Sequence, residues 1–170
     1  MKVARIGERG SEVPAVLDRD GVHRDVSSVV SDFTPEFFAG DGIERLRSSD
    51  LSGLPAVEGR IGAPIAKPSL ILCVGLNYVD HANESSMKVP EEPILFTKAP
   101  NCLVGPYDDV LTPRGATTVD YEVELAVVIG RQCRYLDSPE QAMDHLAGFT
   151  IANDVSERTF QLERGGGQWI

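Results

Sequence analysis

Apolar and polar side chains alternate along residues 119–124, and a continuous apolar run then leads to a glycine at position 130. Alternation with a period of two is typical of a β-strand, and a short unbroken apolar run is typical of a strand buried on both faces. The pattern therefore predicts one long strand over residues 119–130. Because side chains on a strand alternate between its faces, Glu122 and Glu124 are expected to point to the same side.

The rest of the chain shows a mixed order of strand and helix patterns. Alternation and turn residues predict strands over residues 2–6, 12–17, 22–26, 70–74, 94–97 and 149–154. Capping residues and helical spacing predict helices from Thr34, over residues 42–49 and 78–84, and from Ser138 to Gly148. In the last of these, Ser138 is expected to form a capping box with Gln141. Glycine and proline recur through residues 59–68, which predicts a linker between a small N-terminal unit and a second region.

Length and charge narrow the class of protein. The chain has 170 residues and a formal net charge of -10. This charge argues against nucleic acid and anionic membranes as partners, because both require a basic surface. An anionic substrate is still compatible with this negative charge, since a metal ion or a few local lysines and arginines can make the electrostatic field at a binding site positive. No apolar run approaches the ~20 residues of a membrane span, and the first residues lack the apolar core of a signal peptide, so we expect a cytoplasmic protein.

The three cysteines are Cys73, Cys102 and Cys133, and the first two have apolar neighbours in the sequence. They are odd in number and widely spaced, with no Cys-x-x-Cys pair. We therefore expect buried, reduced thiols in a reducing cytosol rather than a catalytic nucleophile or a zinc site.

The two glutamates of the long strand are candidate metal ligands. Two carboxylates on one side of a buried strand repel each other and lose hydration energy, and a divalent cation would compensate both effects. Asp154, at the end of the predicted strand over residues 149–154, supplies a third carboxylate. Oxygen ligands without a nearby Cys or His favour Mg²⁺ or Mn²⁺ over Zn²⁺. The alternative is that Glu122 and Glu124 lie on a solvated face.

Other residues could act on a substrate. His81 and Glu84 are three residues apart and share a helix face, so the carboxylate could orient the imidazole as a general base; a surface pair is the alternative. Lys98 at a strand end and Arg158 at a helix start could bind an anion, with Gln161 about one turn further along. The segment 157–170 could form a lid over the site, and the glycines that follow Arg164 could be its hinge.

In this order, these segments resemble the fumarylacetoacetate hydrolase family over about residues 68–170. The matching residues are 74–78 with His81 and Glu84, then 93–98, 120–130 and 153–158. The run over residues 153–169 is most similar to bacterial members that hydrolyse 2,4-diketo-3-deoxy sugar acids, whose relatives are often labelled ureidoglycolate lyases. The family continues into a Lys-Gly-Lys-Ser-like segment, so the resemblance implies a C-terminally truncated member.

The resemblance implies an α+β fold with a small N-terminal α/β domain over residues 1–65. Residues 66–170 would form the first part of a mixed β-roll that carries the metal and the catalytic residues. The implied metal ligands for Mg²⁺, Mn²⁺ or Ca²⁺ are Glu122, Glu124 and Asp154. The implied catalytic residues are the His81–Glu84 dyad, which would activate water, and Lys98, which would lie near the substrate.

The resemblance also implies an activity, which is metal-dependent hydrolysis of a C–C bond in a 2,4-diketo acid, either an acylpyruvate or a diketo-deoxy sugar acid. The metal would chelate the 2-oxo acid and stabilise an enolate. An isomerase or decarboxylase of 2-oxo acids on the same scaffold is the first alternative. A fragment without catalysis is the second. A homodimer is expected, and no organic cofactor.

Overall fold

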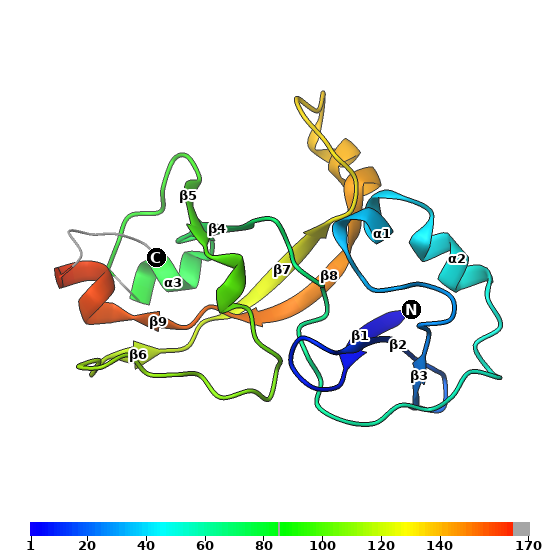
Figure 1. Cartoon of the computed structure of the whole chain (residues 1–170). Coiled ribbons are helices and arrows are strands. Elements are labelled where there is room, and N and C mark those ends of the chain that lie inside the picture. Colours follow the sequence, from blue (N-terminus) through cyan, green and yellow to red (C-terminus); the bar gives the residue numbers. More distant parts are fainter. Residues whose placement is uncertain (85, 165–170) are drawn as a thin grey trace. The chain divides into compact units, whose positions relative to one another are not determined.

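The computed structural model describes residues 1–84 and 86–164 (Figure 1). The strands are β1 (Lys2–Ile6), β2 (Val13–Leu17), β3 (His23–Asp25), β4 (Ile71–Gly75), β5 (Ile94–Lys98), β6 (Val119–Asp120), β7 (Val123–Ile129), β8 (Leu146–Asn153) and β9 (Ser156–Glu157). The helices are α1 (Pro35–Ala39), α2 (Gly42–Ser48), α3 (Val79–Glu84), the 3₁₀ segments η1 (Pro100–Cys102) and η2 (Pro139–His145), and the π-helix η3 (Thr159–Arg164).

The chain forms two compact units. Unit 1 contains Met1–Pro68, Leu103–Leu111 and Val123–Asn153. Unit 2 contains Ser69–Cys102, Thr112–Glu122 and the described residues from Asp154 onward. The chain therefore passes between the units several times. The division into domains at residues 65 and 66 stays a prediction.

The core of unit 1 lies between a small sheet and two short helices. Strands β1, β2 and β3 pair antiparallel in that order. Helix α1 begins as its sequence predicts, because the Thr34 hydroxyl accepts a hydrogen bond from the Phe37 N–H and Pro35 takes the first position. The buried apolar side chains of this core are Val16, Val26, Val30, Phe33, Phe37 and Leu46. Burial of these side chains supplies the main driving force for folding of this unit.

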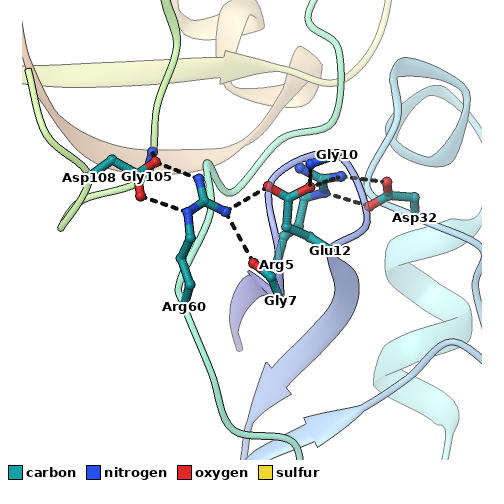
Figure 2. A network of polar contacts seen from close by, with 8 residues as sticks. All are labelled: Arg5, Gly7, Gly10, Glu12, Asp32, Arg60, Gly105 and Asp108. Atoms are coloured by element: carbon teal, nitrogen blue, oxygen red, sulfur yellow. Dashed lines mark hydrogen bonds and ion pairs between the residues drawn. The ribbon is translucent and has the colours of Figure 1, made fainter. Parts of the chain in front are cut away.

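The glycine- and proline-rich segment 59–68 is packed rather than a free linker. The Gly7 N–H donates to the Arg60 carbonyl at 2.8 Å, and the Gly62 N–H donates to the Arg5 carbonyl at 2.7 Å. Figure 2 shows the Arg60 guanidinium between the carboxylates of Glu12 and Asp108. The segment therefore adds to the N-terminal sheet and also holds the loop Leu103–Leu111.

The long strand predicted over residues 119–130 is broken. Residues 119–120 form β6, which pairs with β9, and β7 begins only at Val123 and pairs antiparallel with β8. Expected burial of the apolar run on both faces is also wrong, since Leu125 is 59% exposed and Ile129 57%. The sequence pattern correctly indicated a strand. However, none of the described residues covers the side of the β7–β8 sheet that carries Leu125 and Ile129; both strands are labelled in Figure 1.

The helix predicted from Ser138 to Gly148 is shorter and of another type. Residues Pro139–His145 form a 3₁₀ segment, and β8 has already begun at Leu146, so Gly148 lies within a strand. The predicted capping box is absent from this described segment. The Ser138 side chain makes no capping hydrogen bond, and the Gln141 side chain instead accepts from the Asp137 N–H at 2.9 Å.

Unit 2 carries short two-stranded pairings, β4 with β5 and β6 with β9. Helix α3 follows β4 after Leu76, whose φ of 51° is unusual for a branched side chain. No disulfide joins the cysteines of the described chain, but their expected burial is wrong for Cys102 and Cys133, which are exposed. None of the described helices has the length and apolar character needed to span a bilayer.

Candidate functional site

Two of the predicted metal ligands lie next to each other in unit 2. Glu122 directly precedes β7, and Asp154 directly follows β8. The antiparallel pairing of these strands brings their ends together, and the Asp154 N–H donates to the Glu122 carbonyl at 2.8 Å. Both side chains are mostly buried, with exposed fractions of 16% for Glu122 and 11% for Asp154. The break in the strand therefore places two carboxylates at one backbone junction.

Each of these carboxylates faces a cationic side chain. Arg158 pairs through Nη2 with Glu122, and Lys98 pairs through Nζ with Asp154. Lys98 also donates to the Val155 carbonyl at 3.2 Å. Burial of a carboxylate costs hydration energy unless a counter-charge compensates it, so the two cations stabilise the arrangement. All five residues belong to unit 2.

Asp154 Oδ1 is a buried oxygen that accepts no hydrogen bond of ordinary geometry from the described residues, although the Lys98 ammonium lies within ion-pair distance of it. The opposite charges of Lys98 and Asp154 compensate each other whatever the angle between the two groups. An oxygen in this condition is suited to a hard cation, and the carboxylates of Glu122 and Asp154 are ligands of the kind that Mg²⁺ and Mn²⁺ prefer.

The third predicted ligand, Glu124, lies on β7 in unit 1, half-buried and opposite Ala152. Among the described residues, no three His, Cys, Asp or Glu side chains gather as a group that could hold a metal ion. The donor chemistry at Glu122 and Asp154 fits a divalent cation, and the site of three carboxylates stays a prediction.

Arg158 is held by several partners at once. Its Nε and Nη2 donate to Asp120 Oδ2 at 3.0 and 2.8 Å, and its Nη1 donates to Gln161 Oε1 at 3.0 Å. Gln161 is buried, with 8% exposed, on η3. The predicted substrate-binding residues Arg158 and Gln161 are therefore in direct contact. The hydrogen bonds from Arg158 lower the pKa of Asp120 below its ordinary 3.8, and the charge of His81 acts in the same direction.

The predicted dyad lies on one short helix. His81 and Glu84 both belong to α3 in unit 2, where His81 is half-buried and Glu84 is exposed. The role of His81 and Glu84 as a general-base dyad stays a prediction.

Sequence reasoning missed Glu157, which anchors the start of η3. Its carboxylate accepts hydrogen bonds from the Thr117, Thr118 and Phe160 N–H groups and from the Thr118 hydroxyl, at 2.7–3.0 Å. Burial raises the pKa of Glu157, but the hydrogen bonds from Phe160 and Thr118 outweigh it and bring the pKa to about 2. An acidic residue just before a helix was the available signal.

The predicted lid is described only in part. Residues 159–164 form η3, and the Arg164 guanidinium lies over the Phe160 ring at 4.6 Å. The glycine hinge and the residues up to 170 lie outside the described residues. The lid therefore stays a prediction.

Comparison with known sequences defines the class of protein. The sequence profile described as "Fumarylacetoacetate (FAA) hydrolase C-terminal" matches residues 70–170, more than half of the chain. The chain belongs to the fumarylacetoacetate hydrolase family. The resemblance predicted from its motifs is confirmed.

Three relatives illustrate the range of the family. A protein of Burkholderia multivorans, provisionally named a hydrolase, is 45% identical over 99% of this chain and 60% of its own length. The structure of fumarylacetoacetate hydrolase from Exiguobacterium antarcticum is 33% identical, with a TM-score of 0.73 over 97% of this chain and 59% of that one. The structure of 5-carboxymethyl-2-hydroxymuconate delta-isomerase from Mycobacterium smegmatis is 30% identical, with a TM-score of 0.70 over 100% of this chain and 60% of that one.

Two consequences follow from these matches. The predicted α+β fold is confirmed by the solved structures, which this chain of small sheets and few helices matches. The chain spans about 60% of the length of the curated relatives that it matches.

Proposed function

We propose that this chain is part of a metal-dependent hydrolase that cleaves a C–C bond in a 2,4-diketo acid, an acylpyruvate or a diketo-deoxy sugar acid. The observation that carries the proposal is the charge arrangement of unit 2, where Glu122 and Asp154 adjoin and face Arg158 and Lys98. Carboxylates suit a divalent cation, and the two basic side chains suit an anionic substrate. The hydrolase names among the relatives support the same class.

Each residue has a role in this proposal. Glu122, Glu124 and Asp154 would hold Mg²⁺, Mn²⁺ or Ca²⁺. When bound, the ion would polarise the carboxylate and keto oxygens of a 2-oxo acid. Lys98, Arg158 and Gln161 would bind and orient the acid group of the substrate.

The proton transfers fall to the dyad. His81, oriented by Glu84, would accept a proton from water on a ring nitrogen as the water oxygen adds to the C4 carbonyl. The bond between C3 and C4 then breaks, C3 takes up a proton, and the products are pyruvate or a related 2-oxo acid and a second carboxylic acid. The reaction consumes one water and needs no redox partner.

An isomerase is the second candidate, because solved relatives with similar coverage carry isomerase names. On the same residues, His81 would move a proton between carbon atoms of a 2-oxo acid and no C–C bond would break. A decarboxylase, or a fragment without catalysis, would give other products or none.

We further propose that the protein acts in the cytoplasm as a homodimer, on a small acid rather than on nucleic acid or a membrane; the net charge of -10 supports this choice of partner.

The test is an assay of a panel of acylpyruvates and diketo-deoxy sugar acids with Mg²⁺. The quantity measured is the release of the 2-oxo acid product. His81→Ala should lower turnover by about 10²-fold, the usual size of general-base effects, and leave Mg²⁺ affinity nearly unchanged. His23→Ala, which changes a histidine of β3 in unit 1, is the control. Conversion of the substrate to a tautomer without cleavage would favour the isomerase. Equal turnover of His81→Ala and the wild type would remove His81 from the mechanism.

A further inference from the structure

Arg158 lies between two carboxylates that differ in their contacts. Asp120 Oδ2 accepts hydrogen bonds from both Nε and Nη2 of Arg158, at 3.0 and 2.8 Å. Glu122 is paired with the same guanidinium through Nη2. The side chain of Asp120 is 47% exposed, whereas that of Glu122 is 16% exposed. One cation is therefore shared by an outer carboxylate, held at two points, and an inner one.

We propose that Asp120 is the positioning residue that keeps Arg158 at the site when Glu122 exchanges this ion pair for a divalent cation. The inference rests on the proposed function, because it takes Glu122 to be a metal ligand. Asp120 itself touches neither metal nor substrate in this scheme. It acts through Arg158.

The geometry of Asp120 suits this role. Its backbone is fixed by the antiparallel pairing of β6 with β9, in which it lies opposite Ser156. Its Oδ1 accepts a hydrogen bond from the Tyr121 N–H at 2.9 Å, so one carboxylate oxygen is held by the chain and the other faces Arg158. A carboxylate that is fixed in this way orients a guanidinium more strictly than a mobile one.

Competition for Glu122 makes a second partner necessary. A divalent cation on Glu122 repels the Arg158 guanidinium, and the same oxygens cannot serve both equally well. Without Asp120, Arg158 would either keep its ion pair with Glu122, which would hinder binding of the cation, or have no charged partner. With Asp120 present, Arg158 keeps two hydrogen bonds and its contact with Gln161 Oε1. Its charge then stays available for the acid group of a 2-oxo acid.

The first test is Mn²⁺ affinity, measured by calorimetry on the full chain. We compare the wild type, Asp120→Asn, Arg158→Gln and the double variant, because the difference between the two backgrounds isolates the effect that passes through Arg158. Asp120→Asn should weaken Mn²⁺ binding about fivefold in the presence of Arg158 and less than about twofold in the Arg158→Gln background. Glu92→Gln, which removes an exposed carboxylate of unit 2, is the control for net charge.

The second test follows Arg158 itself, through the NMR signal of its Nε–H group during titration with Mg²⁺. The wild type should keep a protected signal with and without Mg²⁺, whereas in Asp120→Asn the protection should fall when Mg²⁺ is added. A protected signal in both proteins and both states would overturn the proposal.

The outcomes separate this inference from the proposed function. If the wild type binds Mn²⁺ and Asp120→Asn weakens it equally in both backgrounds, only the role of Asp120 is overturned. If the wild type binds neither Mn²⁺ nor Mg²⁺, the metal part of the proposed function fails and the inference fails with it. Rescue of the wild-type affinity by Asp120→Glu would add support, since the longer side chain keeps the charge.

Discussion

At the scale of single residues, the candidate site is held together by charge. Lys98 and Arg158 come from segments that are 60 residues apart, yet each pairs with a carboxylate at the junction of Glu122 and Asp154. Removal of one partner from a buried ion pair leaves the other without compensation, which is more costly than replacement of both. Single substitutions in this set therefore report on more than the side chain that is changed.

Glu157 allows a test of how η3 is fixed. Its carboxylate accepts hydrogen bonds from three backbone N–H groups, those of Thr117, Thr118 and Phe160. The uncharged amide of a glutamine could not accept these hydrogen bonds with the same strength. We predict that Glu157→Gln lowers the melting temperature and speeds amide exchange at Phe160 and Thr118. Glu163→Gln, an exposed change on the same helix, is the control.

The acid dependence of Glu157 gives a second readout of the same prediction. Its pKa is lowered from 4.5 to about 2 in the folded chain, so its contribution to stability is present above pH 4.5 and is lost as the pH falls towards 2. The difference in melting temperature between wild type and Glu157→Gln should shrink over this interval. A constant difference would contradict the assignment.

Sequence alone predicted some of these residues and not others, for a physical reason. Asp154 and Lys98 stand at predicted strand ends and Arg158 at a predicted helix start, which the local pattern marks. Glu122 was found through its alternation with Glu124 along the predicted strand. The partners of Arg158 could not be found in this way, because Asp120 reaches it through the pairing of β6 with β9 across 38 positions. The carboxylate of Glu124 was assigned to the side of Glu122 on the assumption of one continuous strand.

At the scale of elements, the loop Leu103–Leu111 depends on one arginine. Asp108 accepts from Arg60 Nε at 2.6 Å and from the Gly105 N–H at 2.7 Å, and Figure 2 shows Arg60 reaching Glu12 from the same position. Gly105 passes so close to the Ile61 carbonyl that a Cβ there would lie 2.1 Å from it. This contact makes Gly105 necessary and fixes the loop against segment 59–68.

We predict that Asp108→Asn loosens this loop, with faster amide exchange over Leu103–Leu111. The hydrogen bonds from Arg60 and Gly105 lower the pKa of Asp108 from 3.8 to about 2. The stabilisation is therefore present above pH 3.8 and is lost as the pH falls towards 2. The melting temperatures of wild type and variant should differ near neutral pH and converge at pH about 2. Asp109→Asn, at an exposed neighbour, should behave as the wild type; a loop exchange rate unchanged by Asp108→Asn would contradict the role of Arg60.

Element boundaries show where local patterns stop being sufficient. Strands β1, β2 and β5 and helices α1 and α2 lie close to their predicted positions, since alternation and the Thr34–Pro35 cap act locally. The strand break before Val123 has another origin, because residues 119–120 pair with β9 while residues from 123 onward pair with β8. A change of partner strand leaves no mark in an alternating pattern.

At the scale of the whole molecule, unit 1 presents an unusually apolar surface. One side of the β7–β8 sheet carries large exposed apolar side chains, with Leu125 opposite Ile151 and Val127 opposite Phe149. Leu125 is 59% and Ile151 77% exposed. Monomeric proteins rarely leave a contiguous patch of this kind open, so contact with further polypeptide is the physical expectation. The expected homodimer offers one way to cover it.

We predict that the 170-residue chain self-associates through this side of the β7–β8 sheet, and that Leu125→Lys with Ile151→Lys reduces the association. The charges would have to be buried at the contact without partners, which costs several kcal/mol by rough estimate. Sedimentation velocity over a range of concentrations is the measurement, with the weight-average mass expected to fall towards that of one chain in the double variant. Leu111→Lys makes the same change at a leucine that is 87% exposed outside this sheet, so it should leave the mass unchanged. If the wild type is monomeric at every concentration, or if all variants associate equally, this surface does not join copies of the chain.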